Sequence, residues 1–345
     1  MEKEHLLVVR LSAMGDVAMT VPVLIALRRS HPRVSVSVLT KPGFAPIFSQ
    51  LSWITVHTAK VKAEHKGVLG LWRLYKSLGQ TDVTAVADLH HVLRSRILKL
   101  FFKLGGVPVA QLDKGRSEKK ALTAPKNKVF RPLRSTHLRY ADVFARLGLP
   151  LELTPKDVLP KAQLPQNVLE MLPKEQRKWV GIAPFAAFPG KCYPTELMKE
   201  VLKEQSGTGD RMVLLFGGGD KEEALLAEWE AEFDHCFSMA GKVSFVEELK
   251  VISNLDLMLA MDSGNAHLAA MYGVPTITLW GVTHPYAGFA PFAQPPQNAL
   301  LSDVERYPMV PTSVYGNRCP PGYGRVMETI PPALVLKRMG ELLLP

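Results

Sequence analysis

Residues 256–283, DLMLAMDSGNAHLAAMYGVPTITLWGVT, contain a strand, a turn, a helix and a second strand. The apolar run 257–261 ends abruptly at the polar turn 262–265, and residues 266–272 predict a helix that a glycine and a proline end. Residues 274–280 predict a second buried strand. A strand that leads into a polar turn at a helix N-terminus directs backbone N–H groups and the positive end of the helix dipole at one point. The segment therefore predicts an anion site that suits a phosphate.

The alternation of strand and helix extends over the rest of the chain. Apolar runs at 5–11, 34–39 and 83–87 predict strands in the first half, and periodic patterns at 17–29 and 92–104 predict helices between them. A comparable series fills the second half. Such alternation predicts parallel sheets covered by helices, so we expect an α/β fold with two Rossmann-like, doubly wound domains facing a central cleft.

Length and proline content predict how the chain is divided. A chain of 345 residues is too long for one typical core. Five prolines occur between residues 150 and 173 without clear periodicity, which is typical of a hinge or linker. We expect an N-terminal domain at 1–155, a linker at 156–178, a C-terminal domain at 179–330, and a final helix at 331–345 that packs back on the N-terminal domain.

Cysteine usage and hydropathy exclude several classes of protein. The three cysteines are widely spaced and form no CxxC pair, which argues for a reducing compartment and against structural zinc. The N-terminal apolar run is too short for a signal peptide. No apolar stretch approaches the roughly 20 residues that a bilayer-spanning helix needs. We expect a soluble cytoplasmic protein.

Positive charge is concentrated in the first half of the chain. Residues 1–160 contain 26 Lys and Arg against 11 Asp and Glu, whereas residues 161–345 contain 16 against 21. This asymmetry predicts that the first half meets an anionic partner such as a phosphorylated lipid headgroup, a membrane surface or nucleic acid, although the charge could serve solubility alone. In the segment 67–78, GVLGLWRLYKSL, apolar side chains such as Trp72 lie beside basic ones such as Lys76. This segment is either a membrane-facing helix or an ordinary helix whose apolar side covers the core.

Asp16 lies in the loop after the first strand, where doubly wound sheets bind ligands. Its carboxylate either caps the helix expected from Val17 or acts as a general base that faces the cleft. The loop holds one glycine, Gly15, and no GxGxxG pattern, so a dinucleotide site is poorly supported.

Lys191 is the candidate phosphate ligand of the second half. It lies in the loop FPGKCYP at 188–194, which follows a strand and is near the same expected sheet edge as the turn 262–265. A lone loop lysine is either solvated or, in this position, contacts a phosphate. His267, one turn into its helix, is either an ordinary buried histidine or part of the same site.

A glycine turn at 217–220, GGGD, lacks the GK[ST] ending of a P-loop, which disfavours ATP hydrolysis. The simplest interpretation is a strand-to-helix turn. Glu222 or Glu223, which follow it, are either acids of the first helical turn or ligands of a ribose.

Four segments together resemble the ADP-heptose:lipopolysaccharide heptosyltransferase family. They are RLSAMGDVAMTVPVLIALRR at 10–29, GKCYP at 190–194, GGGD at 217–220 and MDSGNAHLAAMYGVPTITLWGVTHP at 261–285. The resemblance implies the GT-B fold, with the acceptor on the N-terminal domain and the nucleotide sugar mostly on the C-terminal one. It also implies three partners, which are an ADP-heptose donor, an acceptor of the lipid A-Kdo type and an anionic membrane surface. Neither nucleic acid nor a cofactor is expected. The enzyme is expected in the cytoplasm, peripheral on the inner face of the inner membrane.

The resemblance also assigns roles to individual residues. Asp16 falls on the catalytic aspartate and Lys191 on the phosphate-binding lysine of the family. Arg94 and Arg96, in the basic helix at 92–104, are candidates for acceptor binding, and no residue is expected to bind a metal. The donor pyrophosphate falls on Asp262, Ser263, Gly264, Asn265 and His267, and the nucleoside falls on Glu222, Gly241 and Val243.

The reaction expected from these residues is an inverting, metal-independent glycosyl transfer. Lys191 and the helix N-terminus would stabilise the departing pyrophosphate, and Asp16 would take the proton of the attacking hydroxyl. Two departures from the family pattern, APFAAFPG at 183–190 and Cys192, leave open a different nucleotide sugar or a catalytically silent binding protein. The single glycine of the first loop disfavours an NAD-dependent oxidoreductase.

Overall fold

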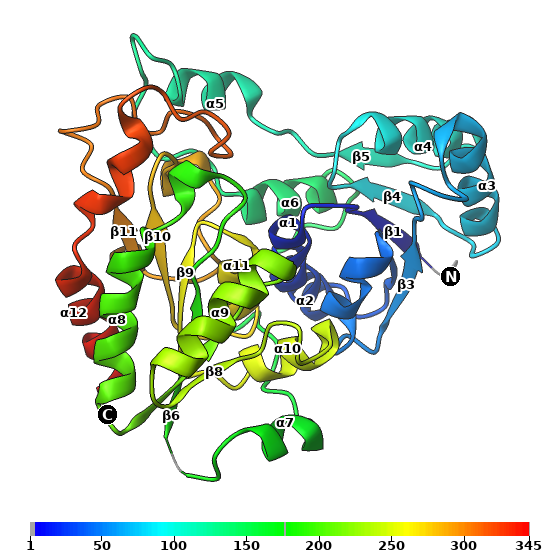
Figure 1. Ribbon diagram of the computed structural model, residues 1–345. Coiled ribbons are helices and arrows are strands. Elements are labelled where there is room, and N and C mark those ends of the chain that lie inside the picture. Colours follow the sequence, from blue (N-terminus) through cyan, green and yellow to red (C-terminus); the bar gives the residue numbers. More distant parts are fainter. Residues whose placement is uncertain (1–3, 176, 345) are drawn as a thin grey trace. The chain divides into compact units, whose positions relative to one another are not determined.

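The computed structural model describes residues 4–175 and 177–344 (Figure 1). The chain divides into two compact units. Unit 1 contains the chain up to Arg116 together with Arg134–Leu159, and unit 2 contains Ser117–Leu133 together with the chain from Pro160 onward. Residues 117–133 lie in the first half of the sequence but pack within unit 2, which the sequence patterns did not indicate.

Unit 1 is built on a five-stranded parallel sheet with the strand order β3-β2-β1-β4-β5. The chain moves outward from β1 to β3 on one side and from β4 to β5 on the other, so the strand order reverses between β1 and β4. Ligands of doubly wound sheets bind at the carboxyl ends of the strands beside such a reversal. The strands are β1 (His5–Val9), β2 (Ser35–Thr40), β3 (Ile54–Thr58), β4 (Ala85–Asp88) and β5 (Val109–Gln111).

The helix expected over 17–29 is two helices, α1 (Met14–Ala18) and α2 (Thr20–Ser30). The break has a local cause, because Pro22 has no N–H to donate to the carbonyl of Ala18. In addition, the hydroxyl of Thr20 donates to the Val17 carbonyl at 2.6 Å. The other helical elements whose residues lie in unit 1 are η1 (Pro42–Phe48), α3 (Gly67–Gly79), α4 (Leu93–Leu104) and α6 (Thr136–Ala145).

Unit 2 is built on a six-stranded parallel sheet with the strand order β11-β10-β9-β6-β7-β8. Here the order reverses between β6 and β9, so the loops that follow these two strands leave the sheet side by side. β9 and β10 are buried along their whole length, as expected for central strands covered on both faces. The strands are β6 (Lys178–Ala183), β7 (Arg211–Leu215), β8 (Cys236–Ser238), β9 (Leu257–Met261), β10 (Thr276–Trp280) and β11 (Ala299–Leu301).

The C-terminal helix α12 (Pro332–Leu343) packs against α8 (Thr195–Gly207) and β9, all within unit 2. We expected this helix to pack on the N-terminal domain. Its main contacts lie in unit 2 instead. The expected linker contains a short helix, α7 (Gln166–Met171), with a buried Val168. The remaining helical elements are α5 (Arg116–Leu122), η2 (Pro189–Lys191), α9 (Asp220–Glu232), α10 (Phe245–Ile252), α11 (Gly264–Ala270), η3 (Pro285–Ala287), η4 (Pro296–Asn298) and η5 (Tyr323–Thr329).

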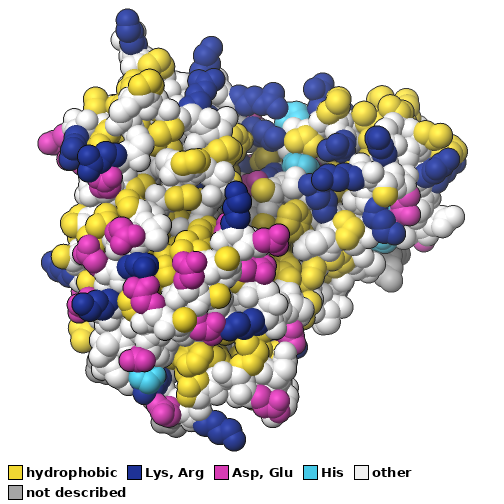
Figure 2. Space-filling model, viewed as in Figure 1, with side chains coloured by type: hydrophobic (Ala, Val, Ile, Leu, Met, Phe, Trp, Pro, Cys, Tyr) yellow, Lys and Arg dark blue, Asp and Glu magenta, His cyan; other side chains and the backbone are white. Residues whose placement is uncertain are grey.

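Two parallel sheets with covering helices confirm the expected α/β architecture of two Rossmann-like units. Lys and Arg side chains are frequent around α3 and α4, whereas Asp and Glu side chains gather over α8 and α9 (Figure 2). Within residues 4–175 and 177–344, none of the helices has the length and apolar character that a membrane crossing requires.

Candidate functional site

The centre of the site in unit 2 is an ion pair between Lys191 and Asp262. Lys191 lies in η2 after β6, Asp262 follows β9, and the Lys191 Nζ is 2.9 Å from the Asp262 Oδ2. Each side chain is only 11% exposed. The hydroxyl of Thr283, which follows β10, donates to the same carboxylate oxygen at 2.8 Å. Three loops at the carboxyl edge of the sheet thus hold one lysine ammonium in a defined place.

The turn after Asp262 carries a polar atom that lacks a partner. Ser263 is extended and precedes the first residue of α11. Its Oγ is buried and accepts or donates no hydrogen bond among the described residues. A buried hydroxyl normally finds a partner, and an anion oxygen would supply one. Gly264 and Asn265 form the first turn of α11, and His267 lies buried within it, so the structure keeps these residues beside the Lys191–Asp262 pair.

A segment near the C-terminus, residues 312–318, covers the Lys191 side chain. The N–H of Thr312 donates to the Val282 carbonyl at 2.9 Å, and the N–H of Val282 donates to the Gly190 carbonyl at 3.0 Å. Gly316, with a φ of +83°, lies so close that a Cβ added to it would be 2.3 Å from the Lys191 Cδ. Only glycine fits there, both for its backbone conformation and for its contact with the lysine. The sequence patterns did not single out this segment.

The family resemblance implies an ADP-linked donor at Lys191. On that basis we expect Gly316→Ala to weaken ADP binding by about tenfold, because the added methyl group must push the Lys191 side chain away from its place beside Asp262. Gly322→Ala is a matched control, since Gly322 has nearly the same φ, +82°, and no atom within 4 Å of the added Cβ. Both variants carry the same backbone strain of about 1 kcal/mol. Isothermal titration with ADP measures the difference, and equal affinities of the two variants would show that the contact with Lys191 is unimportant.

The segment 117–133 supports the same group of loops. The ammonium of Lys128 donates to the carbonyls of Met309 at 2.7 Å and Val310 at 2.9 Å. The ring of Phe130 lies 4.9 Å from the ring of His284, next to Thr283. Burial, with a smaller contribution from the charge of Lys128, lowers the pKa of His284 to about 4, so this imidazole is neutral at pH 7. The segment thus contacts the loops that lie around the Lys191–Asp262 pair.

The glycine turn after β7 is held by the acids that follow it. Glu222 accepts from the N–H of Gly218 at 2.9 Å, and Glu223 accepts from the N–H of Gly219 at 3.0 Å. A Cβ on Gly241 would be 2.6 Å from a carboxylate oxygen of Glu223. The Glu223 carboxylate therefore reaches the turn that contains Gly241, one of the residues expected near the nucleoside. Val243 is half-buried in the same turn, just before α10.

In unit 1, Asp16 forms an ion pair with Arg10 at the end of β1. Arg10 is buried and also donates to the Leu89 carbonyl at 2.6 Å, so its guanidinium links the ends of β1 and β4. Asp16 lies in the first turn of α1 and accepts from the N–H of Ala13 at 3.3 Å. Its side chain is 22% exposed. The carboxylate therefore supports the helix start and also remains accessible, so the two roles considered for it are compatible.

His90 and Lys114 belong to the same group of titratable residues, and sequence analysis missed both. The carboxylate of Asp88, at the end of β4, accepts from the N–H of His90 at 3.0 Å and so fixes the turn that carries it. Burial, followed by the charges of Arg10 and Lys114, lowers the pKa of His90 to about 3. Burial also lowers the pKa of Lys114. The pair His90-His91, one residue after a strand that ends in Asp88, was the available signal in the sequence.

The low pKa of His90 predicts an acid-dependent loss of stability. In the unfolded chain a histidine titrates near 6.5, so between pH 6.5 and 3 the unfolded state binds more protons and the free energy of unfolding falls as the pH falls. For His90 this loss amounts to about 2 kcal/mol between pH 7 and pH 5. We expect His90→Gln to remove that part of the loss, as measured by urea unfolding at the two pH values. An unchanged pH dependence would contradict the assignment.

Arg94 and Arg96 lie in the first turn of α4, and both are exposed. They lie shortly after His90 along the chain. The structure therefore places them where β4 ends, on the edge of the sheet that also carries Asp16.

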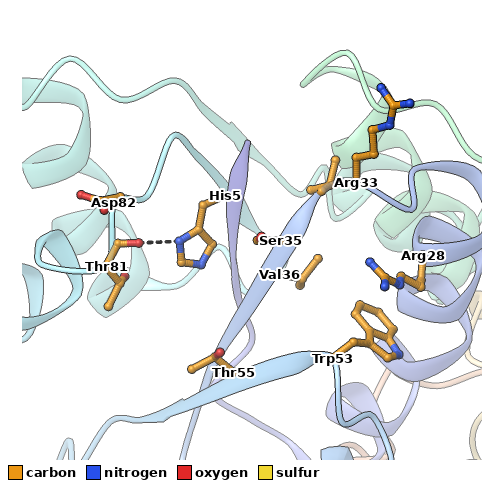
Figure 3. Close-up of a pocket in the computed structure, with 10 residues that line it drawn as sticks. His5, Arg28, Arg33, Ser35, Val36, Trp53, Thr55, Thr81 and Asp82 are labelled. Carbon is orange, nitrogen blue, oxygen red and sulfur yellow. Dashed lines mark hydrogen bonds between the residues drawn. The ribbon is translucent and has the colours of Figure 1, made fainter. Parts of the chain in front are cut away.

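A pocket of about 430 Å³ lies elsewhere in unit 1. Its lining comes from the amino-terminal ends of the strands, the opposite edge from Asp16, and no residue expected at a site belongs to it. His5 points into it and is hydrogen-bonded to the carbonyl of Thr81, and Arg28 lies over the ring of Trp53 (Figure 3). Because ligands of such sheets bind at the carboxyl edge, this pocket is distinct from the candidate site.

Comparisons with known proteins identify the family of the chain. The model of glycosyltransferase family 9 (heptosyltransferase) matches residues 71–312. The lipopolysaccharide core heptosyltransferase OpsX of Haemophilus influenzae is 27% identical over 97% of this chain and 91% of its own length. Lipopolysaccharide heptosyltransferase 1 of Escherichia coli is 23% identical over 81% of this chain and 89% of its own length.

Solved structures share the fold. A glycosyl transferase of family 9 from Veillonella parvula superposes with a TM-score of 0.75 and 17% identity, covering 99% of this chain and 98% of its own. The heptosyltransferase WaaC of Escherichia coli, solved with ADP, superposes with a TM-score of 0.69 and 18% identity, covering 98% and 99%. The chain therefore belongs to glycosyltransferase family 9, the heptosyltransferases.

Proposed function

We propose that the protein transfers a heptose from ADP-heptose to the Kdo/heptose inner core of lipopolysaccharide, with inversion and without a metal ion. The observation that carries the proposal is the Lys191–Asp262 pair beside the buried hydroxyl of Ser263, which has no hydrogen-bond partner in the described part of the chain, in a chain of the heptosyltransferase family. The relatives named above are lipopolysaccharide heptosyltransferases, and WaaC was solved with ADP.

The donor site is proposed in unit 2. Cleavage of the bond between sugar and pyrophosphate leaves negative charge on the departing ADP, and a positioned cation stabilises that charge. Lys191 supplies this cation, and Ser263, Gly264 and Asn265 supply donors for the phosphate oxygens. The nucleoside extends toward Glu222, Gly241 and Val243, where the two acids already hold the glycine turn. Because the Lys191 ammonium stabilises the negative charge on the departing ADP, the proposed step requires no metal.

The base is proposed to be Asp16 of unit 1. In a single displacement, its carboxylate takes the proton from the acceptor hydroxyl as the oxygen attacks the anomeric carbon, which inverts the configuration. Arg10 orients the carboxylate through their ion pair. Arg94, Arg96 and Lys114 are proposed to attract the phosphate and carboxylate groups of a lipid A-Kdo acceptor, which requires the enzyme to work at the anionic inner face of the inner membrane.

Ligand binding and turnover test this proposal together. We expect ADP to raise the melting temperature, UDP to raise it less, and NADH to have no effect, because the proposed site is built for the ADP part of the donor. Mass spectrometry of a reaction with ADP-heptose and a lipid A-Kdo acceptor should show the acceptor heavier by one heptose. Preferential stabilisation by NADH, or transfer from another nucleotide sugar alone, would overturn the assignment of the donor.

A further inference from the structure

Helices α3 and α4 of unit 1 expose an unusual number of large apolar side chains. Leu69 is 61% exposed and Leu104 is 77% exposed. Single exposed leucines are common, but several on neighbouring helices are typical of an interaction surface. We call this surface the α3–α4 face. Its exposed apolar residues are Val68, Leu69 and Trp72 on α3, and Leu93, Leu100 and Leu104 on α4.

Both helices belong to one surface of the unit. Leu74 of α3 and Leu98 of α4 are buried in the same apolar cluster, which also contains Val9 of β1. Tyr75 of α3 packs edge-on against Phe102 of α4, with ring centroids 5.0 Å apart. The helices therefore lie side by side over one face of the sheet, and their outer sides are turned to the same solvent.

The charges on these helices have a single sign. Neither α3 nor α4 contains an Asp or Glu residue. The basic residues are Arg73 and Lys76 on α3, and Arg94, Arg96, Lys99 and Lys103 on α4. The ammonium of Lys76 lies 5.3 Å from the centre of the Trp72 ring, so charge and apolar surface are in direct contact. Apolar and basic side chains alternate over this region in Figure 2.

We propose that the α3–α4 face is the surface by which the protein docks on an anionic lipid bilayer. Exposed leucines and a tryptophan set among lysines and arginines, on two helices that contain no acid, match the acyl boundary and the negative headgroups at the same time. Nucleic acid would match the positive charge of this face, but it would make no contact that explains the exposed leucines. A second copy of the chain would match the leucines and bring like charges together.

The inference rests on the proposed function, because a lipid-anchored acceptor explains why the enzyme should dock. Helix α4 carries residues for both proposed roles, acceptor binding and membrane docking. Its first turn carries Arg94 and Arg96, which are proposed to meet the acceptor, and its C-terminal half carries Leu100 and Leu104. A bilayer in contact with this helix would present the acceptor headgroup near the end of β4.

Co-sedimentation with vesicles tests the docking surface. The full chain should bind vesicles of phosphatidylcholine with about 30% phosphatidylglycerol and bind pure phosphatidylcholine much less. We expect Leu69→Ser with Leu104→Ser to weaken binding more than about tenfold. Arg73→Gln with Lys103→Gln should weaken it by about fivefold per charge at 0.1 M salt, and the difference should disappear at 0.5 M salt.

Matched controls come from unit 2. Leu169 and Leu334 are also exposed leucines, and Leu169→Ser with Leu334→Ser should leave vesicle binding as in the parent. In the parent, Trp72 emission should shift to shorter wavelength on binding, and Trp72→Phe should remove the shift.

Three outcomes would overturn the proposal. One is failure of the parent to bind anionic vesicles, and another is equal binding by the parent and the α3–α4 variants. The third is a dimer in solution that the same substitutions dissociate, which would assign the face to a second copy. The rise in melting temperature with ADP, measured on every variant, keeps the two proposals apart. If the protein bound vesicles but ADP did not raise its melting temperature, the docking surface would be supported and the proposed heptosyl transfer would be contradicted.

Discussion

Replacing Asp16 with alanine is expected to lower turnover by at least about a hundredfold while ADP affinity stays within about twofold of the parent. The carboxylate is proposed to take the proton of the attacking hydroxyl, and alanine cannot accept a proton. ADP binding is proposed to rest on residues of unit 2, to which Asp16 does not belong. Steady-state rates with the ADP-heptose donor, together with calorimetric titration of ADP, measure the two quantities separately.

Loss of the Asp16 carboxylate also removes the ion pair of the buried Arg10 guanidinium, which keeps its hydrogen bond to the Leu89 carbonyl, so some destabilisation is expected. Asp157→Ala is the matched control, because it removes a carboxylate that pairs with Arg29 elsewhere in unit 1. Asp157 is 2% exposed, so its loss should destabilise the unit at least as much. The control should keep its turnover at a temperature where both variants are folded. Full turnover by Asp16→Ala would show that another group is the base.

Replacing Lys191 with alanine is expected to weaken ADP binding by about 10- to 100-fold, because a charge-assisted hydrogen bond to phosphate contributes about 1.5–3 kcal/mol. Turnover should fall by more than the loss of binding explains, since the charge on the departing pyrophosphate is larger in the transition state than in the bound donor. Calorimetry with ADP and single-turnover rates at saturating donor separate the two effects.

The same change leaves the Asp262 carboxylate, 11% exposed, with the Thr283 hydroxyl as its remaining described partner. The variant Lys191→Ala with Asp262→Asn removes this unpaired charge and should recover stability but not ADP affinity. Lys199→Ala, which breaks the exposed pair of Lys199 with Glu232 in the same unit, should affect neither quantity. ADP binding by Lys191→Ala at the affinity of the parent would exclude the lysine from the phosphate site.

Local patterns in the sequence were sufficient to predict the class of the fold and the elements next to the site. The segment 256–283 forms β9, α11 and β10 within a residue or two of the expected bounds, because apolar runs, turn residues and helix stops act on their immediate neighbours. The short strands β5, β8 and β11 were not predicted, since three residues carry no periodicity. The family was likewise recognisable from motifs that lie close together in the sequence.

Tertiary structure decided which of these residues meet. Lys191 and Asp262 form an ion pair because β6 and β9 are neighbours at the point where the strand order reverses, and strand order depends on pairings between distant parts of the chain. The same holds for Gly316 against Lys191 and for the packing of residues 117–133 on unit 2. By itself, the sequence determined the strand and helix order and the chemistry available at each turn, because these depend on residues within a few positions. The surroundings of each side chain depend on contacts between segments far apart along the chain, which only the folded structure specifies.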